Sequence, residues 1–138
     1  MDSLTQAALG AAVGYGVLGR HAGRKALVWG AVLGTLPDLD VFVPLGDDVA
    51  DFTHHRGPTH SLLVHAAATP VIAWAMGRVQ PAILPFRLRR WLLAFLCLTT
   101  HALLDGFTAY STQLLWPLPV APTSWASLFI IDPLFSLP

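Results

Sequence analysis

Apolar residues gather in short segments, and polar residues are largely confined to the stretches between them. The apolar segments cover residues 4–18, 26–36, 61–77 and 91–104, and a last run opens at Leu128. A helix needs about 20 apolar residues to cross a membrane, with about 17 as the lower limit. Segment 61–77 reaches that limit, 91–104 approaches it with its neutral flanks, and the first two are too short to cross alone. The pattern predicts an all-α bundle of about four short helices.

The first two segments carry glycine pairs four positions apart, Gly10 with Gly14 and Gly30 with Gly34. This GxxxG spacing lets two helix backbones approach closely, and glycine is better tolerated in membrane helices than in water. We therefore predict a tight helical hairpin over residues 4–36, partly shielded from lipid by the other helices.

Composition indicates that this bundle is embedded in a membrane. Of the 138 residues, 54% are hydrophobic and only 12% are charged, whereas an ordinary soluble domain is about 25% charged. Zero net charge disfavours nucleic-acid binding, and the single cysteine, Cys97, excludes a disulfide framework or a thiolate metal site. The N-terminus has no basic signal-peptide region, so we expect the first segment to be retained. These features indicate an integral membrane protein that contacts the lipid bilayer.

Charged residues separate to the two ends of the predicted bundle. If the segments alternate in direction, seven of the eight basic residues fall in two turns, 19–25 and 78–90, and all eight aspartates lie towards the other end. The positive-inside rule places the basic turns in the cytoplasm, where Trp74 and Trp91 suit interfacial anchors. The sequence therefore predicts a multi-pass membrane protein with its N-terminus and carboxylates on the outer face. Arg56 is the one basic residue on that face.

The same alternation gathers candidate metal ligands at the outer end, namely Asp38, Asp40, His60, His101 and Asp105. His101 and Asp105 are four positions apart, on one helical face. Asp38 and Asp40 follow Pro37, where we expect extended backbone that points alternate side chains the same way. Two imidazoles and up to three carboxylates suit a divalent ion that activates water. A structural polar network is the alternative, although ionisable residues at membrane depth are usually functional.

Four ordered motifs resemble a known family. "MDSLTQAALG", "GTLPDLD", "HRGPTHS" and "HALLDGFTAY" run from Met1 to Tyr110 and look like the successive motifs of the LexA-regulated, membrane-bound metal-dependent hydrolases of the YdjM type. The resemblance implies a bacterial inner-membrane protein, distantly similar to the zinc-dependent phospholipase C and P1 nuclease group of all-helical phosphoesterases. In that group an Asp, a His and a His-x3-Asp pair hold a metal. By motif, these ligands become Asp38 or Asp40, His60, and His101 with Asp105.

Two departures from the family pattern bear on this site. Gln6 stands where many relatives have His, which argues against a second metal at that position, and no further His or Glu follows Asp105. The chain stops at "DPLFSLP", as an apolar run begins. We therefore expect residues 1–138 to form a single membrane-embedded hydrolase-like domain, the N-terminal portion of a longer multi-helix protein.

The predicted activity is metal-assisted hydrolysis of a phosphoester on a lipid or envelope substrate. Zn²⁺ is the first expectation for the ion, with Mn²⁺ or Mg²⁺ as alternatives. Arg56 suits contact with a phosphate or other anion, and His55 suits a proton donor or a further ligand. A non-catalytic metal-binding or transport protein stays open as the alternative. A lipid phosphatase of the vanadium-haloperoxidase-like type is disfavoured, because Ala94-Phe95 occupies the place of its Ser-Arg pair.

Overall fold

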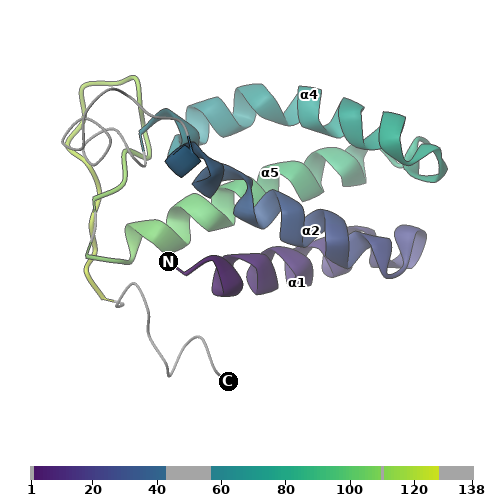
Figure 1. Ribbon diagram of the computed structural model, residues 1–138. Coiled ribbons are helices and arrows are strands. Elements are labelled where there is room, and N and C mark those ends of the chain that lie inside the picture. Colours follow the sequence, from purple (N-terminus) through teal and green to yellow (C-terminus); the bar gives the residue numbers. More distant parts are fainter. Residues whose placement is uncertain (1, 43–56, 110, 128–138) are drawn as a thin grey trace.

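The computed structural model describes residues 2–42, 57–109 and 111–127, and for residues 40–42 it describes the backbone alone. Within these ranges the protein has four α-helices, three short 3-10 helices and no β-sheet (Figure 1). The α-helices are α1 (Ser3–Ala22), α2 (Lys25–Thr35), α4 (Leu62–Val79) and α5 (Arg87–Gly106). Helix α5 is central, because it contacts each of the other three. The prediction of an all-α bundle of about four helices is confirmed.

Helices α1 and α2 form a hairpin in which the two backbones touch. Asp2 caps α1 by accepting a hydrogen bond from the amide of Thr5, and Gly23, with a φ of 56°, follows its last residue and opens the turn. A Cβ atom on Gly10 would meet the carbonyl group of Gly30, and one on Gly30 would meet the carbonyl group of Gly10. The close approach predicted from the GxxxG spacing is therefore present, and no larger residue fits at this contact.

Helix α4 is the one helix among the described residues that is long and apolar enough to cross a membrane. Ser61 caps its start, where the hydroxyl oxygen accepts hydrogen bonds from the amides of Leu63 and Val64. Large apolar side chains are exposed on the outer faces of α2 and α4, among them Val28, Val32, Val71 and Trp74. Exposed apolar surface of this kind is typical of a protein that contacts a membrane or a partner.

Helix α5 begins earlier than the hydrophobic pattern predicts. Its first residue is Arg87, whereas the apolar segment starts at Trp91. Arg89 and Arg90 therefore lie on the first turn of the helix and not in the connecting turn. Arg90 is buried. The sequence placed this residue in a cytoplasmic turn and did not predict its burial.

The residues after α5 return to the start of α4. The amide of Leu62 donates to the carbonyl of Leu114 over 2.9 Å, and the Ser61 hydroxyl donates to the carbonyl of Trp116 over 2.6 Å. The apolar run that opens at Leu128 lies outside the described residues. The described part of this segment therefore covers the end of the bundle at which α4 begins.

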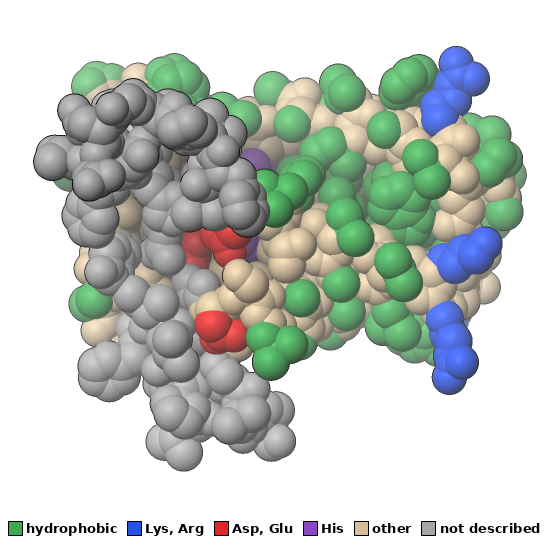
Figure 2. All heavy atoms as spheres, in the orientation of Figure 1, with side chains coloured by type: hydrophobic (Ala, Val, Ile, Leu, Met, Phe, Trp, Pro, Cys, Tyr) green, Lys and Arg blue, Asp and Glu red, His purple; other side chains and the backbone are tan. Residues whose placement is uncertain are grey.

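The two ends of the bundle bury different side chains. Near the α1–α2 and α4–α5 turns the core is apolar and includes Leu18, Ala26, Met76, Ile83 and Leu93. At the opposite end the buried residues are largely polar and include Gln6, His60, His65, His101 and Asp105. Figure 2 shows lysine and arginine side chains at the first end and aspartates towards the second. We call these the arginine end and the polar end.

Candidate metal centre

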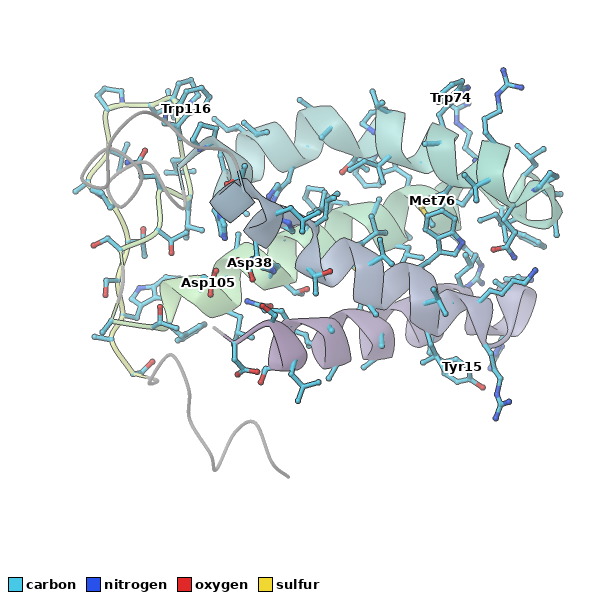
Figure 3. The ribbon with its side chains drawn as sticks, viewed as in Figure 1. Tyr15, Asp38, Trp74, Met76, Asp105 and Trp116 are labelled. Carbon is cyan, nitrogen blue, oxygen red and sulfur yellow. The ribbon has the colours of Figure 1, made fainter. Side chains whose placement is uncertain are left out.

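Three separate elements bring four ionisable side chains together at the polar end. Asp38 lies on the 3-10 helix η1 (Leu36–Phe42), His60 is the last residue of η2 (Pro58–His60), and His101 and Asp105 lie near the end of α5. Their ligand atoms, one from each residue, all lie within 4.8 Å of one another. Figure 3 shows Asp38 and Asp105 close to each other, between η1 and α5. These residues, the four-residue cluster, could hold a metal ion.

Each imidazole Nε2 atom lies at a similar distance from both carboxylates and from the other imidazole. His60 Nε2 lies 3.5 Å from Asp38 Oδ1 and 3.1 Å from Asp105 Oδ2. His101 Nε2 lies 3.3 Å from the same Asp38 oxygen and 3.4 Å from the same Asp105 oxygen. The two Nε2 atoms are 3.1 Å apart.

This spacing can be compared with that of a metal site. For bonds of about 2.0–2.2 Å in tetrahedral geometry, neighbouring ligand atoms are about 3.3–3.6 Å apart. The five separations that involve an imidazole nitrogen, 3.1–3.5 Å, are close to that range, and all four ligand atoms lie within 4.8 Å of one another. Two imidazole nitrogens with two carboxylate oxygens also form a donor set that suits Zn²⁺ and neighbouring divalent ions. Both the spacing and the chemistry of the four side chains therefore fit a divalent metal.

Hydrogen bonds on the far side of the rings turn both imidazoles towards the cluster. His101 Nδ1 lies 2.6 Å from the carbonyl oxygen of Gly34, a pure acceptor, so this nitrogen carries the hydrogen. In the neutral ring the lone pair is then on Nε2, which faces the carboxylates. His60 Nδ1 lies 3.0 Å from the Thr59 hydroxyl oxygen, which can accept in the same way. This is the arrangement that orients histidine ligands in metal sites.

Burial makes the cluster costly without a positive charge at its centre. The side chains of His60, His101 and Asp105 are fully buried, whereas that of Asp38 is 20% exposed. Two carboxylates that face each other in a buried site repel unless a cation lies between them. Either protonated imidazoles or a metal ion can supply that charge. Asp38 is the member of the cluster through which solvent reaches it.

The electrostatics of Asp38 favour its ionised form. Burial by itself raises the pKa of this carboxyl, but hydrogen bonds donated by the imidazoles of His101 and His60 when Nε2 is protonated, together with the positive charge of His101, outweigh burial and hold the pKa well below its usual range. Asp38 is therefore a carboxylate at neutral pH, which is the form that binds metal ions.

Gln6 is a neighbour of the cluster, in the N-terminal stretch that the sequence placed at the same end of the bundle. Its Nε2 donates to Asp105 Oδ1 and to the carbonyl of His101, both over 3.4 Å. Its Oε1 is buried and has no hydrogen-bond partner among the described residues. Gln6 therefore holds Asp105 from the side opposite the imidazoles. The sequence left open whether Gln6 joins the site, because the approach of α1 to α5 is a tertiary feature.

The backbone conformation at Asp38 and Asp40 differs from the predicted one. Residues 36–42 form a 3-10 helix and not an extended segment. Pro37 explains the difference, because its fixed φ is compatible with a helical turn directly after α2. Alternation therefore no longer places Asp38 and Asp40 on one side, and the side chain of Asp40 is outside the described residues.

The remaining candidates are His55, Arg56 and His65. His55 and Arg56 lie outside the described residues, so their expected roles as proton donor and anion contact stay predictions. His65 is buried, and its Nε2 lies 2.8 Å from the carbonyl oxygen of Thr59. This contact fixes η2 beside α4. The structure thus brings together Asp38, His60, His101 and Asp105, whose role as ligands stays a prediction.

Comparison with known proteins gives a family of inner-membrane proteins and one curated relative. A family model for the YdjM inner membrane protein matches residues 1–138. The uncharacterized protein YfhP of Bacillus subtilis (strain 168) is 29% identical over 145 residues, which cover 96% of this chain and 41% of YfhP. The chain thus spans about two fifths of the length of this curated relative. No solved structure matches the chain.

Proposed function

We propose that this chain, which belongs to the YdjM inner membrane protein family, is a membrane-bound, metal-dependent hydrolase. Its substrate class would be a phosphoester of a lipid or another envelope molecule. The single observation that carries the proposal is the convergence of Asp38, His60, His101 and Asp105 at ligand spacing in a buried site. A multi-pass arrangement with this site on the outer face, LexA regulation and a distant relationship to the phospholipase C and P1 nuclease group belong to the same proposal.

The four side chains would bind the ion through His60 Nε2, His101 Nε2 and one oxygen of each carboxylate. A bound divalent metal supplies a water molecule of lowered pKa and polarises the phosphoester. Gly34 and Thr59 keep the imidazoles in the tautomer that binds, and Gln6 holds Asp105 in place. The partial exposure of Asp38 gives a substrate one side from which to approach.

Residues outside the described ranges would complete the reaction. Arg56 is expected to contact the phosphate through its guanidinium, and His55 to donate a proton to the leaving group. Both immediately precede the segment that ends at His60. Their chain distance from His60 is short enough for both side chains to reach the same site.

The test measures metal content and hydrolysis together. Protein purified in detergent should contain about one equivalent of Zn²⁺, Mn²⁺ or Mg²⁺ by elemental analysis and should hydrolyse a generic phosphodiester or phosphomonoester. His101→Ala should lose both properties, and chelation should abolish turnover until metal is restored. An unchanged metal content in His101→Ala would remove the central claim. Metal without turnover would instead support a non-catalytic metal-binding or transport protein.

A further inference from the structure

A second site lies at the arginine end, between α4 and α5. A cleft of about 480 Å³ is lined by Arg78, Arg87 and Arg90, by Trp74 and Trp91, and by apolar residues of α4 and of the α4–α5 connection. None of the lining residues is acidic. Arg90 and His101 are eleven positions apart on α5, which corresponds to about 16 Å along the helix. The cleft is therefore separate from the four-residue cluster, and Figure 3 places Trp74 far from Asp38 and Asp105.

Arg90 is built into the wall of this cleft. It is 93% buried, and its guanidinium donates to the carbonyls of Ala73 over 2.6 Å and Leu84 over 3.2 Å. A Cβ atom at Gly77 would meet the same guanidinium, so glycine at this position makes the burial possible. The Nε atom of Arg90 is buried and has no hydrogen-bond partner among the described residues.

Among the described residues, no acidic side chain neutralises the positive charge of the cleft. No carboxylate within the described part of the chain pairs with Arg90, whose two bonded nitrogens contact neutral carbonyl groups. Arg78 lies over the ring of Trp74, 5.2 Å from its centroid, and Arg87 is exposed at the rim. A buried guanidinium that lacks an anion is costly, and an anion from outside the chain would relieve this cost. Arginine forks are well matched to phosphate oxygens.

The surroundings of the cleft favour a lipid over a free ion. Leu84 lines the cleft, and Val79 and Leu88 follow Arg78 and Arg87 in the sequence; all three are large apolar residues that are exposed. These residues can accept acyl chains, while tryptophan is the side chain most often found at the level of lipid headgroups. Basic pockets between helices at the cytoplasmic surface bind anionic headgroups in membrane proteins generally. We propose that this arginine cleft binds the headgroup of an anionic phospholipid. The proposal does not rest on hydrolase activity or on a metal at the polar end.

The test uses the full chain in a neutral detergent. Short-chain phosphatidylglycerol, short-chain phosphatidylcholine and inorganic phosphate are titrated separately, and tryptophan fluorescence and the melting temperature are recorded. Phosphatidylglycerol should bind saturably and raise the melting temperature, because it binds the folded state. Phosphatidylcholine should give no saturable change, and phosphate should bind at least about tenfold more weakly. Phosphate binding as tight as phosphatidylglycerol would overturn the lipid assignment in favour of a free anion.

Two double variants distinguish binding in the cleft from binding by the net charge of the arginine end. Arg78→Gln with Arg87→Gln removes two exposed arginines of the cleft and should raise the dissociation constant for phosphatidylglycerol at least about tenfold. Arg20→Gln with Arg24→Gln removes the same charge from the neighbouring α1–α2 turn and should change it by no more than about twofold. An equal loss in both variants would show binding by net charge and would overturn a defined site. Unchanged affinity in the cleft variant would overturn the proposal directly.

Discussion

The polar end and the arginine end of this bundle hold charge in opposite ways. At the polar end, imidazoles and carboxylates converge on one point, with separations of 3.1–3.5 Å, and three of the four side chains are fully buried. At the arginine end, three guanidinium groups of one sign surround a cleft of about 480 Å³, and two of them are exposed. One arrangement leaves room for a single small cation. The other leaves room for a larger anionic group.

The difference shows how one small bundle can separate a cluster that suits a cation from a cleft that suits an anion. Convergent charges of opposite sign need rigid placement, which hydrogen bonds of the two imidazoles to Gly34 on α2 and Thr59 on η2 supply. Like charges around a cleft require only that one of them is held in place. Arg90 is held between α4 and α5, because its guanidinium donates to the carbonyl of Ala73. On α5 the buried apolar residues Ala94 and Cys97 lie between Arg90 and His101 and separate the cleft from the four-residue cluster.

The largest expected effect tests whether the metal belongs to the polar end. His60→Ala removes one of four ligands and should weaken Zn²⁺ binding at least about 100-fold, since changes to residues that merely support ligands already cost about 10–100-fold. Titration calorimetry after chelation measures the affinity. The matched control is His21→Ala, an exposed histidine at the arginine end that stacks on Phe86. Equal losses in both variants would mean that zinc binds without preference for the polar end.

The next effect concerns the hairpin that positions Gly34 and Gln6 at the polar end. Gly30→Ala would place a Cβ against the Gly10 carbonyl and should lower the free energy of unfolding by about 1–3 kcal/mol. Gly16→Ala, on the open face of α1, meets no atom within 4 Å and should be neutral or stabilising by about 0.5–1 kcal/mol. Denaturant unfolding in detergent measures both. If the two variants had the same stability, the backbone contact would not hold the hairpin.

The smallest expected effect concerns the support of Asp105. Gln6→Leu removes the hydrogen bond to Asp105 and should weaken Zn²⁺ binding by about tenfold, with the stoichiometry retained. Gln80→Leu is the control at the arginine end, where Gln80 Oε1 accepts from the indole of Trp29. That variant should leave zinc affinity unchanged. A Gln6→Leu protein with wild-type affinity would contradict a supporting role for Gln6.

Much of the fold followed from local patterns. The apolar segments located the four α-helices, because period and length of apolar runs depend only on neighbouring residues. The GxxxG pairs predicted the α1–α2 contact, since a missing Cβ is itself the reason that backbones can approach. The His-x3-Asp spacing put His101 and Asp105 on one face, because residues four positions apart are neighbours on the surface of an α-helix.

Other features depended on contacts between distant segments. The sequence predicted extended backbone after Pro37, whereas proline also fits the 3-10 turn that continues α2 and carries Asp38 to the cluster. Burial of Arg90 required Gly77, thirteen positions earlier, to leave space on the facing helix. Neither feature has a signature within its own stretch of chain.

By itself, then, the sequence determined the class of fold, the four helical segments, the separation of charge and the residue types available for a metal. The tertiary structure alone decided that Asp38, His60, His101 and Asp105 meet at ligand spacing, that Gln6 supports Asp105, and that an arginine cleft forms at the other end. The physical reason is that helix formation is local, whereas a site requires side chains from several helices at defined distances. Those distances follow from how closely the helices approach, which here depends on glycine contacts between α1 and α2 and between α4 and α5.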